Sequence, residues 1–100
     1  MKLKPGFKDE YKKRHDQIWP ELKDALLKAG IYEYSIFFDQ YSHTLFAFQK
    51  LKKDHESDQL PELSIMKKWW DHMKDIMEVN PDNSPVVVPL EEVFYLEKDE

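Results

Sequence analysis

Two neighbouring segments, residues 32–39 and 44–51, constrain the fold of this chain most strongly. Their sequences, YEYSIFFD and TLFAFQKL, are rich in aromatic and β-branched residues, and only Gln40 to His43 separate them. Such runs, bounded by a short polar connection, predict two strands joined as a β-hairpin. Side chains alternate between the two faces of a strand, so one face is expected to carry Tyr32, Tyr34, Ile36 and Phe38, and the other Glu33, Ser35 and Phe37.

Helical periodicity is present on both sides of this hairpin. Before it, apolar residues recur at spacings of three and four from Phe7 to Ala29, and Gly30 is a natural C-cap. Pro20 interrupts that pattern because it removes a backbone donor and crowds the preceding turn. We therefore expect either a kink or two helices, with Pro20 opening the second. A further amphipathic helix is expected over 63–77, with its apolar stripe formed by Leu63, Met66, Trp69, Trp70, Met73, Ile76 and Met77.

Short strand signals at the two ends complete the order of elements. Met1 to Lys4 are expected to form a strand end, and Glu91 to Leu96 (EEVFYL) a final strand. The resulting order βαββαβ predicts one α+β domain over residues 1–100, a ferredoxin-like sandwich with both helices on one face of an antiparallel sheet. No third layer is left to cover the other face, so we expect a homodimer that packs sheet on sheet.

Composition argues against several classes of function. Acidic residues outnumber basic ones by 20 to 15, a net charge of −5, which argues against a nucleic-acid or anionic-membrane partner. The chain has no cysteine, no His-x-x-x-His spacing and only two glycines, so neither a metal nor a nucleotide cofactor is expected. No apolar run approaches the roughly 20 residues that span a bilayer, and no signal peptide is recognised. We expect a soluble cytoplasmic domain.

The 14 aromatic residues, 14% of the chain, are more than one small core readily holds, so some are expected at a subunit interface or a ligand site. His15 follows Tyr11 by four residues, so both side chains leave one helix face in the same direction. An imidazole can give and take a proton near neutrality, although a core histidine with one hydrogen bond is the commoner outcome of such spacing.

Trp69 and Trp70 are consecutive, so on a helix they project about 100° apart. One can anchor the core while the other faces a cleft for a flat, partly apolar ligand such as a sugar ring. Packing of both in one wide apolar stripe is an equally good interpretation of the pair.

Together these residues resemble the L-rhamnose mutarotase family, in one order along nearly the whole chain. Two stretches are specific: Arg14-His15 followed by Ile18-Trp19-Pro20-Glu21-Leu22, and the turn Asn80-Pro81-Asp82-Asn83-Ser84-Pro85. Residues 52–63 carry no part of the likeness. The remaining segments that carry it are Glu10 to Lys13, Gly30, Tyr34 to Ile36, Leu45 to Ala47, Trp69-Trp70 with Met73, and Glu92 to Leu96.

The resemblance implies a dimeric α+β barrel that interconverts the α and β anomers of L-rhamnose, or a related 6-deoxy sugar, without cofactor or metal. It implies that His15 is catalytic, and we expect this residue to donate a proton to the ring oxygen. The residues that match the family's substrate-binding positions are Tyr11, Tyr34, Trp69 and Trp70. Because family members usually carry several residues before the position of Met1, the first strand is expected to be truncated.

Two alternatives stay open on the sequence. The first is another small enzyme of the same dimeric architecture, either a cofactor-free monooxygenase or a haem-handling protein, whose cleft would also use His15 and the tryptophan pair. The second is a non-catalytic sugar-binding module, in which a sugar would change tryptophan fluorescence without exchange of its anomers.

Overall fold

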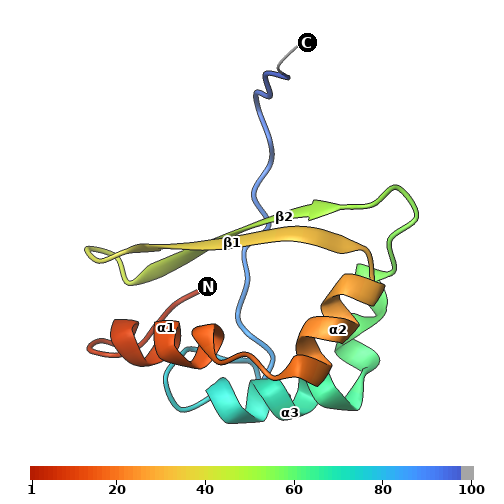
Figure 1. The fold of residues 1–100 in the computed structure, drawn as a ribbon. Helices are drawn as coiled ribbons and strands as arrows, with labels where there is room; N and C mark the ends of the chain where they lie inside the picture. The colour runs from red at the N-terminus through yellow and green to blue at the C-terminus, as the bar shows by residue number, and fades with distance from the viewer. Residues whose placement is uncertain (98–100) are drawn as a thin grey trace.

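The computed structural model of the protein describes residues 1–97 and has two layers (Figure 1). The strands β1 (Ile31–Asp39) and β2 (Thr44–Leu51) form one layer, and the helices α1 (Lys8–Asp16), α2 (Pro20–Lys28) and α3 (Ser64–Met73) form the other. A 3-10 helix, η1 (Ser57–Glu62), leads into α3. The α+β class is confirmed. The end of the predicted domain, 98–100, lies outside the described residues.

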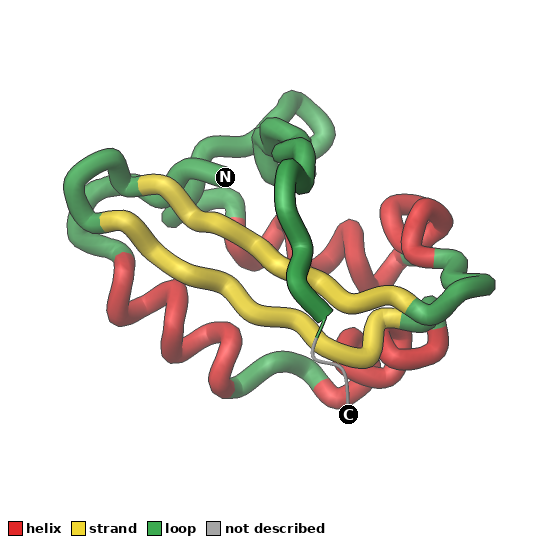
Figure 2. Tube along the Cα trace, turned by 90° about the horizontal axis from the view of Figure 1, so that it is seen from above, coloured by secondary structure: helices red, strands yellow, loops and turns green. Residues whose placement is uncertain are grey.

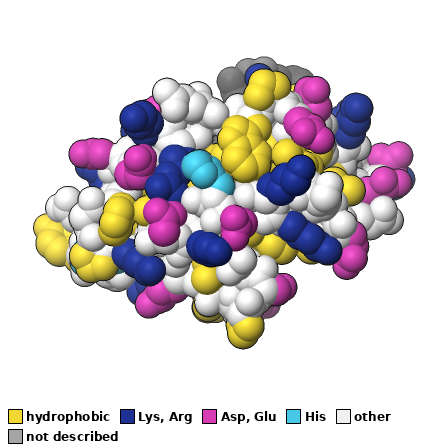
Figure 3. Space-filling view, turned by 90° about the horizontal axis from the view of Figure 1, so that it is seen from below, with side chains coloured by type: hydrophobic (Ala, Val, Ile, Leu, Met, Phe, Trp, Pro, Cys, Tyr) yellow, Lys and Arg dark blue, Asp and Glu magenta, His cyan; other side chains and the backbone are white. Residues whose placement is uncertain are grey.

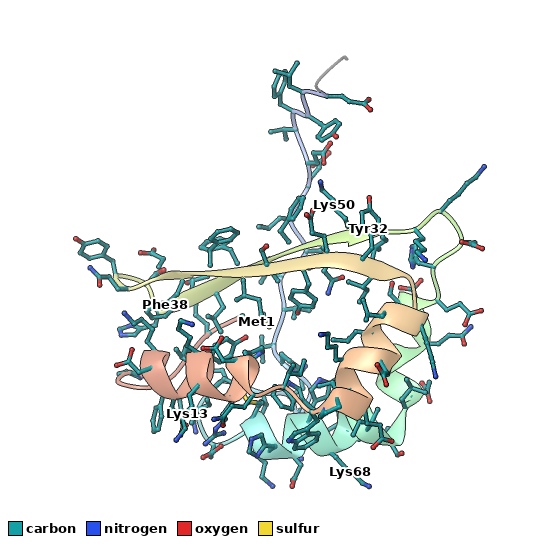
Figure 4. The ribbon with its side chains drawn as sticks, viewed as in Figure 1. Met1, Lys13, Tyr32, Phe38, Lys50 and Lys68 are labelled. Atoms are coloured by element: carbon teal, nitrogen blue, oxygen red, sulfur yellow. The ribbon has the colours of Figure 1, made fainter. Side chains whose placement is uncertain are left out.

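The predicted hairpin is present, with β1 and β2 antiparallel (Figure 2). We call the sheet face toward the helices the inner face and the opposite one the outer face. Ile31 is opposite Leu51 and Glu33 is opposite Lys50, so Tyr32 is an extra residue in a bulge. Figure 4 shows Tyr32 on the outer face. The prediction that Tyr32 shares a face with Tyr34 was therefore wrong, because a bulge shifts the alternation of side chains.

Proline and glycine delimit α2. α1 ends at Asp16, Trp19 is extended with ψ 132°, and Pro20 is the first residue of α2, so the chain forms two helices rather than one kinked helix. Gly30 follows α2 with φ +98°, a left-handed conformation that glycine adopts without steric cost. A Cβ at Gly30 would also lie 2.8 Å from the Cβ of His55, so a larger residue would displace the loop before η1.

The α3 helix is shorter than the sequence pattern predicts. It ends at Met73, and Met77 instead forms an antiparallel bridge with Leu3. The flanking hydrogen bonds join Lys4 N–H to the Ile76 carbonyl (2.9 Å) and Glu78 N–H to the Lys2 carbonyl (3.0 Å). Pairing with the N-terminal segment thus ends the helix, because the same backbone groups cannot serve a helix and a ladder.

The N-terminal segment lies between two neighbours. Lys2 bridges Thr44 at the start of β2, while Leu3 bridges Met77 on the other side. Leu3 N–H donates to the His43 carbonyl at 2.9 Å, and Leu45 N–H donates to the Met1 carbonyl at 2.7 Å. Residues 1–4 therefore extend the hairpin laterally, although they form isolated bridges and not a regular strand.

The predicted strand Glu91 to Leu96 was wrong. Val86 N–H donates to the Glu78 carbonyl, and beyond it residues 87–97, which we call the C-terminal arm, form no regular structure. A strand needs a neighbour for its N–H and C=O groups, and the described chain supplies none to this segment. Figure 1 shows that the arm leaves the body and extends past the sheet on its outer side.

The hydrophobic core fills the space between the inner face and the helices. Leu22 and Ile76 are its most completely buried side chains. The cluster is formed by Leu3, Tyr11, Leu22, Leu45, Trp69, Met73, Ile76 and Met77. On the opposite side of the helices, basic and acidic side chains are interspersed (Figure 3), as expected for solvated helix faces. Over residues 1–97, no helix combines the length and apolarity that crossing a membrane requires.

Candidate active site

A cavity of about 970 Å³ opens between the inner face of the sheet and the helices. All five residues that the sequence analysis proposed for the site contribute to its wall. Tyr11 and His15 come from α1, Tyr34 comes from β1, and Trp69 and Trp70 come from α3. The fold therefore brings residues from three elements to one apolar hollow with a few polar groups, the usual form of a small-molecule site.

His15 is held by the helix turn that precedes it. Its Nδ1 lies 3.0 Å from the backbone carbonyl oxygen of Tyr11. A carbonyl can only accept, so this bond places the proton on Nδ1 and leaves Nε2 with a free lone pair in the neutral ring. Burial lowers the pKa of His15, and the bond to Tyr11 and the charge of Asp16 offset this only in part. The imidazole is therefore neutral near pH 7 and carries a basic Nε2.

Aromatic rings enclose the imidazole on two sides. The Tyr11 ring stacks on it with a centroid distance of 4.2 Å and an interplanar angle of 28°. Trp69 meets it edge-on at 5.3 Å and 89°. Trp69 is in turn held by Trp19, whose ring lies 5.1 Å away at 88°. These contacts limit rotation of the His15 side chain, so its Nε2 has a defined position.

Two phenol groups lie close to one another in the site. Burial raises the pKa of Tyr11, and repulsion from a charged Tyr34 would raise it further. Burial also raises the pKa of Tyr34, opposed by a hydrogen bond from Gln49, even though 41% of the Tyr34 surface remains exposed along the cavity. Both phenols are consequently neutral at physiological pH, so each keeps an O–H group that can donate a hydrogen bond.

The two tryptophans differ in burial, although both border the cavity. Trp69 is 7% exposed and belongs to the core, whereas Trp70 is half-buried. The sequence left open whether one residue of the pair faces a cleft or both only pack. The cavity is wide enough that side chains about 100° apart on α3 both reach it, so packing and cleft contact coexist in Trp69.

Comparison with known proteins matches these observations to one family. The family model described as L-rhamnose mutarotase matches residues 1–96. An L-rhamnose mutarotase of Formosa agariphila is 61% identical over 97 residues, which is 97% of this chain and 93% of the relative. That of Phocaeicola vulgatus is 56% identical with the same coverage. This chain belongs to the L-rhamnose mutarotase family.

The three-dimensional structure agrees with that assignment. The crystal structure of L-rhamnose mutarotase FA22100 from Formosa agariphila superimposes with a TM-score of 0.89 at 61% identity, and covers 97% of this chain and 93% of that one. The resemblance inferred from the sequence is thus confirmed. Family membership supports the mutarotase interpretation over the monooxygenase, haem-handling and sugar-binding alternatives, and mutarotases are isomerases.

The structure adds polar groups that the sequence analysis missed. Gln49, opposite Tyr34 in the hairpin, and Asn83, in the turn after α3, both border the cavity of this mutarotase-family chain. Gln49 had a usable signal, since it is polar where Leu45, Ala47 and Leu51 occupy the same strand face. Asn83 lies in one of the two stretches that are specific to the family resemblance, but its position against the cavity depends on how the turn folds back to the sheet.

Proposed function

We propose that this protein is an L-rhamnose mutarotase that interconverts the α and β anomers of L-rhamnose, or of a closely related 6-deoxy sugar, in the cavity between sheet and helices. The observation that carries the proposal is the state of His15. A neutral imidazole with a fixed tautomer and a free Nε2 borders a hollow with two neutral phenols and two indoles. Opening a hemiacetal requires such a proton carrier, because no electron or group is transferred.

The proposed reaction uses one imidazole twice. Nε2 of His15 accepts the proton of the anomeric hydroxyl, while the bond between C1 and the ring oxygen breaks and C1 becomes an aldehyde. The ring oxygen is bonded to the same carbon as the anomeric hydroxyl, so the imidazolium can hand its proton to that oxygen. The aldehyde then rotates about its bond to C2, and the reverse steps close the ring on the other face. A positioned acid or base of this kind typically contributes roughly 10²- to 10⁴-fold.

This sequence refines the expectation that His15 donates a proton to the ring oxygen. Because the pKa of His15 is lowered, the neutral imidazole first acts as a base and accepts the proton of the anomeric hydroxyl. The imidazolium formed in this step then donates the proton to the ring oxygen. Tyr11 and Tyr34, neutral at pH 7, donate hydrogen bonds to sugar hydroxyls. Trp69 and Trp70 supply apolar surface for the C–H face of the sugar and for its C6 methyl group.

Saturation-transfer NMR on the anomeric protons of L-rhamnose tests the function directly. Wild-type protein is expected to exchange the anomers well above the spontaneous rate, and His15→Ala to reduce this exchange to near background. The matched control is His43→Asn, because His43 lies outside the cavity with φ 54° and asparagine tolerates that conformation. Wild-type exchange in a folded His15→Ala variant would contradict the role of His15.

For the architecture, we propose the ferredoxin-like arrangement within a single domain over residues 1–100. The antiparallel bridges support it, since they place the segments in the lateral order β1, β2, residues 2–3 and residue 77. This is the order in which the first strand of a βαββαβ unit lies between the third and the fourth.

We further propose that the protein is a homodimer in which the outer faces of two sheets pack together, as in dimeric α+β barrels. Phe37, Phe46 and Phe48 lie on the outer face and are 64%, 44% and 51% exposed. The C-terminal arm extends past the sheet on the same side (Figure 1), and it carries further exposed apolar side chains, among them Val93, Phe94, Tyr95 and Leu96. Apolar surface of this extent is typical of protein interfaces, and a second copy offers an identical apolar face to match it.

A further inference from the structure

The turn at residues 80–85, with the sequence NPDNSP, is ordered by its own polar side chains. Asn80 Nδ2 donates to Ser84 Oγ at 3.0 Å, and Asn80 N–H donates to the Ser84 carbonyl at 2.7 Å. Asp82 accepts hydrogen bonds from the backbone N–H and the hydroxyl of Ser84. Three of the four polar side chains are therefore used to hold the turn itself.

The fourth polar side chain, Asn83, is used differently. Its backbone N–H donates to the Asn80 carbonyl at 2.8 Å, but no hydrogen bond of its carboxamide is found within residues 1–97. The residue is half-buried and borders the cavity. No side-chain polar atom in the described chain is both buried and unpartnered, so the Asn83 amide is exposed, on a residue that borders the cavity.

The backbone conformation of Asn83 limits the residues that fit this position. Its φ is +71°, in the left-handed region that glycine occupies without strain and that asparagine adopts more readily than most other residues. Glycine can therefore take this position without a change in the turn. Unlike glycine, asparagine carries a carboxamide, with two N–H donors and one acceptor oxygen, on a residue that borders the cavity.

The location of Asn83 complements the polar groups already described. The Val79–Pro85 bridge anchors the turn beside residue 77, at the opposite side of the sheet from β1. Tyr34 and Gln49 reach the cavity from the hairpin, and His15 reaches it from α1. A sugar in the cavity would meet hydrogen-bonding groups from both lateral sides, as a ligand with several ring hydroxyls requires.

We infer that Asn83 is a specificity-determining residue whose carboxamide binds a ring hydroxyl of the sugar from the wall opposite Tyr34. The inference rests on the proposed function, because it names a further contact of the same substrate. The contacted hydroxyl does not react, so its hydrogen bond to Asn83 stabilises the bound ground state and the transition state equally. Loss of the contact therefore raises KM and leaves kcat nearly unchanged.

The decisive variant is Asn83→Gly, which removes the carboxamide and keeps the positive φ. We expect its KM for L-rhamnose to rise roughly threefold to tenfold, the range for one lost hydrogen bond, with kcat changed by less than about twofold. His43→Gly is the matched control, because it removes another side chain at positive φ, 54°, outside the cavity. Its KM and kcat are expected to equal those of the wild type.

Monodeoxy analogues of L-rhamnose, each lacking the hydroxyl at C2, C3 or C4, identify the contact. The penalty of Asn83→Gly is expected to vanish for the analogue without the contacted hydroxyl and to persist for the other two. An unchanged KM in Asn83→Gly, or an equal penalty for L-rhamnose and all three analogues, would overturn the assignment. Wild-type protein without anomer exchange would instead refute the proposed function, so the two failures are distinguishable.

Discussion

At the scale of single residues, the proposed chemistry of the site depends on one turn of α1. Tyr11 holds Nδ1 of His15 through its backbone carbonyl and covers the imidazole with its ring. The same residue thus selects the tautomer and contributes to the burial that lowers the pKa of His15. A spacing of four residues is sufficient for both effects, because it places the two side chains one above the other on α1.

The lowered pKa of His15 predicts the pH dependence of the reaction. The base form is neutral, so kcat/KM is expected to stay level as pH falls from 8 to neutrality and to decline only with a midpoint below 6.5, the ordinary histidine value. Anomer exchange measured by NMR between pH 5 and 8 gives this midpoint. A midpoint above 6.5 would contradict the lowered pKa, and activity that rises on acidification would show that His15 acts as the protonated acid from the start.

The same shift affects stability with a definite sign. The pKa of His15 is lower in the folded state than in the unfolded chain, so on acidification the unfolded chain binds the proton first. The free energy of unfolding therefore decreases as pH falls through 6.5, and levels off below the folded pKa. Urea denaturation at several pH values should show a shallower decrease in His15→Ala than in the wild type.

At the scale of elements, an arginine joins α1 to the end of α3. Arg14, which is adjacent to His15, makes a two-pronged contact with Asp75 at 2.9 and 3.2 Å and donates to the His72 carbonyl at 2.7 Å. The Arg14 side chain is 17% exposed, whereas that of Asp75 is 61% exposed. The contact therefore supplies a hydrogen-bond donor to a backbone carbonyl in the last turn of α3. It also links α1 to α3, the two helices that carry His15 and Trp69.

Removal of this contact is expected to destabilise the fold modestly. Arg14→Ala should lower the free energy of unfolding by about 0.5–1.5 kcal/mol, mainly through the lost hydrogen bond to the His72 carbonyl and lost packing. A double-mutant cycle with Asp75→Ala measured in urea should give a coupling of about 0.2–1 kcal/mol, because Asp75 is largely in water.

The control for the Arg14 measurement is Lys74→Ala. Lys74 pairs with Asp71 at 2.7 Å, but both side chains are about half exposed or more, at 49% and 63%. Its substitution is expected to change stability by less than about 0.5 kcal/mol. Equal losses in Arg14→Ala and Lys74→Ala would contradict a special role for the contact between α1 and α3.

At the scale of the whole molecule, apolar surface collects on one side. The outer face and the C-terminal arm expose large apolar side chains, while the helices expose charges of both signs (Figures 1 and 3). The radius of gyration, 14.5 Å, exceeds the roughly 13 Å of a compact chain of 100 residues, as the extended arm requires. Packing of two outer faces would remove this surface from water.

The dimer predicts a sedimentation mass near twice 12.1 kDa and a sensitive position on the outer face. Phe37→Glu would bury a carboxylate between the two sheets, so it is expected to shift the protein to the monomer in analytical ultracentrifugation. Tyr41→Glu is the matched control, because Tyr41 is 89% exposed in the hairpin turn, and should remain dimeric. Wild-type protein that sediments as a monomer would refute the homodimer.

The sequence by itself determined the local structure and the juxtaposition of Tyr11 and His15. Pro20 and Gly30 delimit α2 because they restrict or release backbone angles locally, and the spacing of Tyr11 and His15 is a property of one helix. The hairpin likewise follows from adjacent strands that need no distant partner.

Only the tertiary structure decided the features that depend on distant neighbours. Met77 lies outside α3, contrary to the prediction, because the N-terminal segment pairs with it. Residues 91–96 form no strand because the described chain gives them no partner. Asn83 joined the cavity because the turn folds back beside residue 77. The physical reason is the same in each case: a backbone ladder and a cavity wall are formed between segments far apart in sequence, and residue type or periodicity within one segment does not specify the other.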